Sequence, residues 1–370
     1  MVFLLIASFI ASTVVAVLLI RWASDHAKHY DADKPQRFHI GDVPRLGGVA
    51  ILAGLLAGWA VAAVSEQMGW TMNTQLSPGV WLGWTLMILP AVCGGAFEDA
   101  TQRLPVWLRL LLTGVSAALA CWLLGVSVPR LAIPGLDPLL LASPWLGVAI
   151  AVFAICGLPH AFNIIDGYNG LAGTVAVMIA LALAHVALQV GDREIAVIVL
   201  CMVGATGGFL LLNYPRGLIF AGDGGAYLWG IVIAVASIAL VHRHEAISPW
   251  FPMLLLMYPV WETAFSIYRK LARGVSPGMA DALHFHQLIY RRIVRGVFHD
   301  DVSRRMLMRN NRTSPYLWGF TLLTVVPAVL FWNHTVALVI CCILFALFYV
   351  SAYLMLVRFK TPRWLVSRHK

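Results

Sequence analysis

Long apolar runs recur along the whole chain, separated by short polar stretches. About 20 apolar residues are needed to cross the hydrocarbon core of a bilayer. Runs of that order predict eleven spans: 2–20, 46–64, 79–97, 106–126, 145–163, 170–190, 195–213, 224–241, 247–268, 316–334 and 335–357. Asn333 and His334 are the only polar break between the last two. We therefore expect an all-α fold, a polytopic transmembrane helical bundle of about eleven spans.

The composition agrees with this pattern. Only 12% of the 370 residues are charged and 60% are hydrophobic, whereas soluble domains carry about 25% charged residues. A globular surface of this size would be poorly solvated, so much of it must face lipid. No internal repeat and no second folded domain is visible. The sequence predicts a single integral-membrane domain over 1–370, with a cytoplasmic loop at 269–314 between spans nine and ten.

The basic residues give the orientation. With the N-terminus outside, 22 of the 26 lysine and arginine residues fall on the inner side, and the outer loops carry only Arg130, Arg193 and Arg243. Positive residues concentrate in cytoplasmic loops. This predicts a periplasmic N-terminus and a cytoplasmic C-terminus.

Four acidic residues lie where predicted spans meet the cytoplasmic surface. Glu98 and Asp99 end the third span, Asp166 follows the fifth, and Asp223 precedes the eighth. Charged side chains at membrane depth are rare and usually face a polar cavity or a partner. Their position on one predicted face indicates a shared site. A fifth acid, Glu262, lies inside the predicted ninth span.

Three of these acids lie in glycine-rich segments. Asn163, Asp166 and Asn169 are three residues apart and would share a face of a helical turn. Asp223 precedes a helix N-terminus, where backbone N–H groups favour phosphate. Magnesium takes one or two carboxylates and completes its shell with water and phosphates. Each acid alone is typical of a cap or a turn, but four on one face favour a functional site.

Two basic segments are candidates for binding an anionic substrate. His284, His286 and Arg291 lie in the large loop, and Lys34 and Arg45 in the first inner loop. Histidines two residues apart do not share a helix face, which predicts a loop or a helix entry. Zinc is poorly supported, because no cysteine or further histidine lies at ligand spacing. For the first loop, phosphate binding and anchoring to lipid headgroups are both open.

Together these segments resemble the polyprenyl-phosphate N-acetylhexosamine-1-phosphate transferase family, glycosyltransferase family 4, with its bacterial undecaprenyl-phosphate GlcNAc-1-phosphate transferases. The resemblance covers nearly the whole chain and rests on five motif regions in the family's order. It implies that Asp99 lies near the attacking lipid phosphate. Glu98 replaces the first of the family's paired aspartates, and either acid would orient or deprotonate that phosphate.

The resemblance also implies ligands for the donor. Asp223, with Asn163, would hold Mg²⁺, for which Mn²⁺ is a substitute. The segment with Asp166 and Asn169 is similar to the central nucleotide-sugar and metal motif, which implies a catalytic role for Asp166 and a substrate-binding role for Asn169. His160 stands there where an Asn is usual. The uridine would be held by Asn213 and Phe220.

His284 and His286 are similar to the His-x-His motif of the hexosamine-type members. This disfavours the peptidoglycan-type translocase of the same family, which carries a triple-histidine run. Arg291, Lys34 and Arg45 complete the expected substrate-binding set.

The expected reaction transfers an N-acetylhexosamine 1-phosphate from a UDP-sugar to undecaprenyl phosphate and releases UMP, as the first membrane step of O-antigen or related surface polysaccharide synthesis. The protein would lie in the bacterial inner (plasma) membrane, with its active site on the cytoplasmic face. Expected partners are the lipid acceptor, the UDP-N-acetylhexosamine donor and membrane lipids, and no nucleic acid. A homodimer is compatible with the sequence. A secondary transporter that uses Glu262, the peptidoglycan-type translocase and an inactive scaffold of the same fold are the alternatives.

Overall fold

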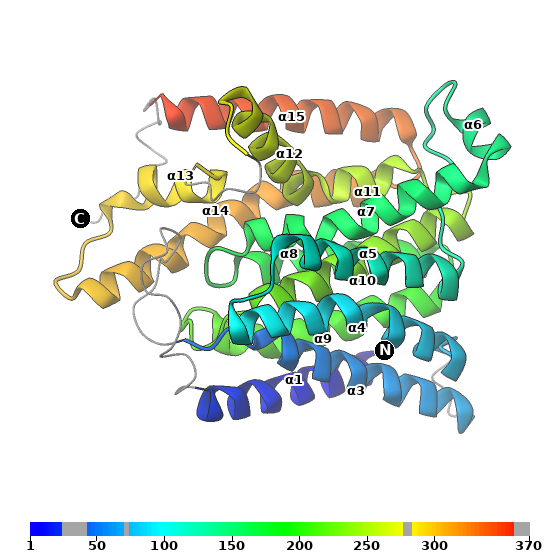
Figure 1. Ribbon diagram of the computed structural model, residues 1–370, viewed down its shortest axis with the longest axis horizontal. Coiled ribbons are helices and arrows are strands. Elements are labelled where there is room, and N and C mark those ends of the chain that lie inside the picture. Colours follow the sequence, from blue (N-terminus) through cyan, green and yellow to red (C-terminus); the bar gives the residue numbers. More distant parts are fainter. Residues whose placement is uncertain (24–42, 70–73, 277–282, 359–370) are drawn as a thin grey trace.

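The computed structural model describes residues 1–23, 43–69, 74–276 and 283–358, which form helices joined by short connections (Figure 1). The helices are α1 (Val2–Trp22), α3 (Gly47–Gln67), α4 (Pro78–Thr101), α5 (Val106–Leu124), α6 (Asp137–Ala142), α7 (Pro144–Ile165), α8 (Leu171–Gln189), α9 (Arg193–Asn213), α10 (Gly222–Arg243), α11 (Trp250–Leu255), α12 (Met257–Ala272), α13 (Phe285–Arg292), the 3₁₀ turn η1 (Val294–Gly296), α14 (Val302–Leu330) and α15 (Thr335–Val357).

Ten of the described helices are long and apolar enough to cross a membrane. They are α1, α3, α4, α5, α7, α8, α9, α10, α14 and α15. The last two predicted spans are separate helices, because α14 ends at Leu330 and α15 begins at Thr335. The predicted all-α, polytopic membrane fold is confirmed.

The predicted ninth span, 247–268, differs from the others. It consists of two helices, α11 and α12, which meet at Leu256. Pro259 follows in the first turn of α12. Proline has no N–H to donate and its ring clashes with the carbonyl four residues earlier, so a continuous helix through this point is unfavourable. The apolar run alone could not reveal this break.

The predicted loop 269–314 is largely helical where the structure describes it. It contains the end of α12, α13, η1 and the start of α14. Helix α14 begins well before the predicted span at 316. Asp301 is its N-cap and accepts the backbone N–H groups of Ser303 (2.8 Å) and Arg304 (3.4 Å). The N-terminal half of α14 therefore extends the bundle at the end where α13 lies (Figure 1).

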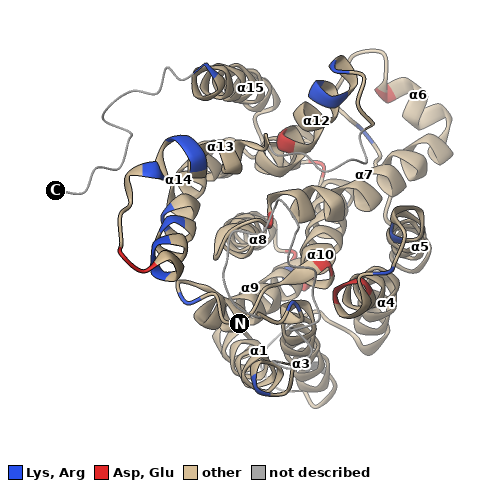
Figure 2. Cartoon of the chain, turned by 60° about the vertical axis from the view of Figure 1, so that its left-hand side comes forward, with Lys and Arg blue, Asp and Glu red and all other residues tan. Residues whose placement is uncertain are grey.

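Helix α10 forms the centre of the core. It packs against α4 and α7 and also contacts α3, α8 and α9, and Figure 2 shows α8, α9 and α10 inside a ring of the other long helices. Nearly all of α10 is buried, which explains why it is apolar on all sides. Its polar N-terminus is the exception and lies at one end of the bundle.

Glycines allow α3 and α4 to approach this N-terminus closely. A Cβ atom on Gly48 would lie 2.2 Å from the Gly225 nitrogen, and one on Gly95 would lie 2.5 Å from the Gly224 nitrogen. No side chain fits at these crossings, so the glycines fix the distance between the backbones. As a result, the acidic end of α4 meets the start of α10.

Basic residues are distributed unevenly between the two ends of the bundle. In Figure 2 they gather on α13, the start of α14 and the ends of α12 and α15. The opposite end holds Arg130, which donates to four carbonyl groups around the end of α10, and Arg243, which pairs with Asp192 and Glu194.

Candidate active site

A cavity of about 290 Å³ lies at the end of the bundle where α10 begins. It brings together ten of the thirteen residues predicted for the site: Arg45, Asp99, Asn163, Asp166, Asn169, Asn213, Phe220, Asp223, His284 and His286. They come from separate helices and loops, so only folding makes them neighbours. Of the other three, Glu98 lies beside the cavity without lining it, Arg291 is exposed elsewhere, and Lys34 lies outside the described residues.

Asp99 holds the start of α10. Its two carboxylate oxygens accept the backbone N–H groups of Asp223 (2.8 Å) and Gly224 (2.9 Å), and it is only 5% exposed. Gly222 makes this contact feasible, since a Cβ there would lie 2.4 Å from Asp99 Oδ2. A carboxylate bound to a helix N-terminus is well stabilised. In the structure Asp99 therefore fixes the position of Asp223, in addition to the role that the motif implies.

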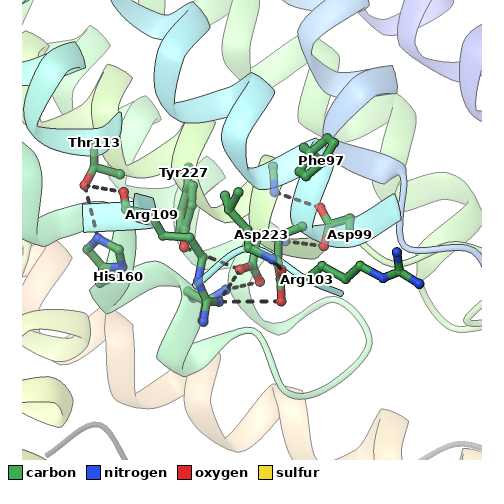
Figure 3. A network of polar contacts seen from close by, with 12 residues as sticks. Phe97, Asp99, Arg103, Arg109, Thr113, His160, Asp223 and Tyr227 are labelled. Atoms are coloured by element: carbon green, nitrogen blue, oxygen red, sulfur yellow. Dashed lines mark hydrogen bonds and ion pairs between the residues drawn. The ribbon is translucent and has the colours of Figure 1, made fainter. Parts of the chain in front are cut away.

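Asp223 is the centre of the polar network in Figure 3. Its Oδ1 accepts the Asn163 side-chain N–H (2.7 Å), and its Oδ2 accepts Arg109 (2.9 Å) and the Tyr227 hydroxyl (3.4 Å). The two residues predicted to hold the metal are thus in direct contact. Asp223 connects the cavity, on the Asn163 side, with α5, on the Arg109 side.

The metal prediction can be compared with the oxygen donors present. Within the described ranges, no group of three or more histidine, cysteine or acidic side chains is arranged to hold an ion. Asp223 and the amide oxygen of Asn163, with Asp166 on the same cavity wall, offer few protein oxygens. Magnesium usually keeps water and substrate phosphates as its other ligands. The residues therefore fit a phosphate-bound Mg²⁺ and not an ion enclosed by protein alone.

Arg109 is a residue of the site that the sequence prediction missed. Besides Asp223, its guanidinium lies 4.0 Å from Glu98, and its side chain is 23% exposed. Glu98 in turn accepts the backbone N–H of Leu104 (2.7 Å). The sequence feature that could have revealed Arg109 is its position as a single arginine inside an apolar run, which usually indicates a buried partner or a polar cavity.

His160, which replaces the usual asparagine, lies near this network but does not line the cavity. It makes a hydrogen bond with Thr113 (3.2 Å), and its ring packs edge-on against Tyr227 (5.2 Å; Figure 3). It therefore joins α5, α7 and α10 behind Asp223.

The loop between α7 and α8 is held by amide side chains. The backbone N–H of Asn169 donates to Asn310 Oδ1 (2.8 Å), and its side-chain N–H donates to Asn311 Oδ1 (3.0 Å). Asn213 accepts the N–H of Gly170 (2.7 Å) and donates to the carbonyl of Ile219 (2.8 Å). The amides expected to contact the donor thus also shape the cavity wall.

Asn310 and Gln287 also line the cavity and were missed. Both lie in the segment that was predicted as a loop. Gln287 lies in the first turn of α13 and Asn310 in the third turn of α14, so both could be sought only once these segments are recognised as helices.

Asp166 follows the end of α7 and faces the cavity. Burial, reinforced by the charge of Asp223 and opposed by Arg45, raises its pKa from 3.8 to about 7. Without a bound cation the folded protein therefore retains this proton at mildly acidic pH.

This shift predicts a pH-dependent stability. Between about pH 3.8 and about 7 the folded protein binds a proton that the unfolded chain has released, so the free energy of unfolding falls as pH rises through this window and is level above it. Asp166→Asn cannot suffer this loss. We expect its melting temperature to exceed that of the wild type by at least about 2 °C near pH 8, with a much smaller gap near pH 5, in metal-free thermal unfolding. A gap independent of pH would contradict the assignment.

The fold and the cavity define a class: a multi-pass membrane protein with a polar, acid- and amide-lined site at one end of its bundle. Sequence comparison shows which family the chain resembles. The model of the family described as Glycosyl transferase family 4 matches residues 81–241, which include most of the cavity-lining acids and amides. The chain is similar to this family over that segment, and its relatives are named as polyprenyl-phosphate sugar-1-phosphate transferases, which confirms the resemblance of its motifs.

Three relatives illustrate the similarity. The probable undecaprenyl-phosphate N-acetylglucosaminyl 1-phosphate transferase of Bacillus subtilis is 26% identical over 270 residues, 72% of this chain and 71% of the relative. The decaprenyl-phosphate N-acetylglucosaminephosphotransferase of Mycolicibacterium smegmatis is 27% identical over 308 residues, 76% and 72% of the two chains. The phospho-N-acetylmuramoyl-pentapeptide-transferase of Synechococcus sp. is 27% identical over 296 residues, 76% and 81% of the two chains. Identity alone does not separate the two kinds of transferase.

Proposed function

We propose that the protein transfers an N-acetylhexosamine 1-phosphate from a UDP-sugar to undecaprenyl phosphate. An oxygen of the lipid phosphate attacks the β-phosphorus of the donor. A new P–O bond forms, the bond from the β-phosphorus to the bridging oxygen breaks, and UMP leaves with that oxygen. The observation that carries the proposal is the cavity lined by Asp223 and Asn163, with Arg109 bound to Asp223 outside it. The names of two relatives, which give a polyprenyl phosphate and a phosphorylated N-acetylglucosamine group, support the same reaction class.

The side chains of the cavity suit an anionic donor. Asn163 and Asp223 would hold Mg²⁺, which when bound offsets the charge of the diphosphate. Arg45 lines the same cavity and adds a cation of the protein's own. Asn213 and Phe220 form the wall assigned to the uridine. Catalysis then depends on positioning and on charge complementarity, as transfer at phosphorus requires.

The cavity would open on the cytoplasmic side of the bacterial inner membrane. Arg45, Arg216 and the basic α13–α14 region belong to the cavity end of the bundle, whereas Arg130, Arg193 and Arg243 belong to the other end. The positive-inside rule favours this orientation. UDP-sugars would then reach the site from the cytoplasm, for the first membrane step of O-antigen or related surface polysaccharide synthesis.

A peptidoglycan-type translocase is the second candidate, supported by the similarity to the Synechococcus protein. It differs in its donor, which carries a pentapeptide. The His284-x-His286 pattern favours a plain N-acetylhexosamine. The secondary transporter loses support because Glu262 is engaged by three hydrogen-bond donors and is not poised to exchange ions.

The direct experiment uses purified protein with undecaprenyl phosphate, Mg²⁺ and a panel of UDP-sugars that includes UDP-GlcNAc and the pentapeptide donor. We expect UMP and a lipid-linked sugar from an N-acetylhexosamine donor. UMP from the pentapeptide donor alone would identify the translocase. No UMP from any donor would reject the proposed function.

Removal of divalent cations is expected to abolish this activity. The carboxylates of Asp99, Asp166 and Asp223 line the cavity and would repel a diphosphate unless a cation offsets the charge. EDTA should therefore reduce UMP release to background, and added Mg²⁺ or Mn²⁺ should restore it. Undiminished release in EDTA would remove the metal from the proposal, while the transfer itself would stand.

A further inference from the structure

Glu262 is a wholly buried carboxylate behind the cavity wall. It lies in α12 with 0% exposure, and three donors from α13 and α15 surround it. The Tyr349 hydroxyl donates to Oε2 (2.6 Å), while the Phe285 backbone N–H (3.0 Å) and His284 Nδ1 (3.1 Å) approach Oε1. A buried charged group persists only when it is well hydrogen-bonded. The fold thus maintains a carboxylate at this point, directly behind His284.

The partner of this carboxylate faces the substrate. His284 is the N-cap of α13 and lines the cavity, where its ring stacks on that of His286 (5.4 Å, 8° between planes). The segment before it is held by Arg269, which donates to the Leu283 carbonyl (2.6 Å) and to the Tyr353 hydroxyl (2.5 Å). The ring therefore has little freedom to turn.

The contact with Glu262 determines which ring nitrogen carries the proton. A carboxylate oxygen only accepts, so a 3.1 Å contact with Nδ1 requires a proton on Nδ1. In the neutral ring Nε2 is then the acceptor, and the partner of one nitrogen sets the role of the other. Histidines that bind metals are oriented by carboxylates in the same way.

We propose that Glu262 is a positioning residue: it receives Nδ1–H of His284 and so presents Nε2 to the cavity, to accept a hydrogen bond from a hydroxyl or amide N–H of the donor sugar. The identity of the ligand rests on the proposed function, but the tautomer of His284 does not.

One competing arrangement uses the same atoms. The backbone N–H of Gln287 also points at the His284 side chain, in a capping box in which the Gln287 side chain accepts the His284 N–H (3.3 Å). If that contact decided the tautomer, Nδ1 would be bare and Glu262 would have to be protonated. The two arrangements make opposite predictions for the ring nitrogens.

The first test is the ¹⁵N spectrum of histidine-labelled protein without substrate, with the His284 signals assigned by their loss in His284→Gln. We expect a protonated Nδ1. A bare Nδ1 would overturn the proposal. Glu262→Gln, which retains an acceptor oxygen, should keep this pattern, and Glu262→Leu should change it. An unchanged His284 spectrum in a folded Glu262→Leu protein would also overturn it. If Glu262→Leu does not fold, the wild-type spectrum decides.

The second test is turnover. Glu262→Leu should lower kcat/KM for the UDP-sugar by about 10–100-fold, the range seen when the carboxylate partner of a metal-bound histidine is removed. Glu262→Gln should retain most of the activity, and Thr263→Ala, next to it on α12, should match the wild type. Wild-type activity in a folded Glu262→Leu protein would overturn the positioning role. An inactive wild type with a protonated Nδ1 would instead reject the proposed function and leave the tautomer intact.

Discussion

Replacing Asp223 by alanine is expected to lower the rate of UMP release by about 10²–10³-fold or more, the cost of removing one pre-positioned electrostatic group from an active site. The Asp223 carboxylate accepts hydrogen bonds from both Asn163 and Arg109. Its loss would remove the proposed metal carboxylate. It would also leave Arg109 with the more distant Glu98, at 4.0 Å, as its acidic partner among the described residues. Initial rates with saturating UDP-sugar and undecaprenyl phosphate would measure the effect.

Two further variants separate charge from folding. Asp223→Asn keeps the size of the side chain and a hydrogen-bond acceptor but has no charge, so it should be nearly as inactive as the alanine variant. Glu245→Gln removes an exposed acid at the opposite end of the bundle and should behave as the wild type. Size-exclusion elution and melting temperature would establish that each variant is folded. Full activity in a folded Asp223→Ala protein would rule out the proposed site.

Most of the fold followed from the length of apolar runs, because a membrane-spanning helix needs a fixed number of apolar residues. The ninth span was predicted as a single helix because composition does not record where a proline interrupts hydrogen bonding. The start of α14 was missed for the opposite reason: a polar, arginine-rich stretch was interpreted as a loop. Asp301 as an N-cap was the local signal that could have corrected this.

The candidate site was predictable where glycine and acid occur together in one segment. Asp99, Asn163 and Asp223 belong to such segments, and their meeting required only that the helix ends lie at one face. Partners chosen by tertiary packing were not predictable. Arg109 is 114 residues from Asp223, and Asn310 is 141 residues from Asn169. No local spacing indicates such pairs, and only the packing of α5 and α14 brings their members together.

The position of Arg109 predicts a selective effect on the lipid acceptor. Arg109 contacts Asp223 on the side away from the cavity. The neighbouring side chains of α5 that face outward are large and apolar, with Trp107 64% and Leu111 53% exposed. Such a face suits lipid. A phosphate carried by a polyprenyl chain would therefore reach Arg109 from the bilayer, while the UDP-sugar occupies the cavity.

Arg109→Met should accordingly lower kcat/KM for undecaprenyl phosphate by about 10²-fold, since truncating one member of a hydrogen-bonded charge pair costs several kcal/mol. Binding of the UDP-sugar, measured by calorimetry, should change far less. Arg109→Lys should recover part of the loss, because lysine keeps the charge but not the planar donor geometry. Arg103→Gln is the matched control, an exposed arginine nearby that makes no contact with Asp223 among the described interactions. If Arg109→Met weakened binding of the UDP-sugar as much as it lowered kcat/KM for undecaprenyl phosphate, Arg109 would act by supporting Asp223 and not by contacting the acceptor.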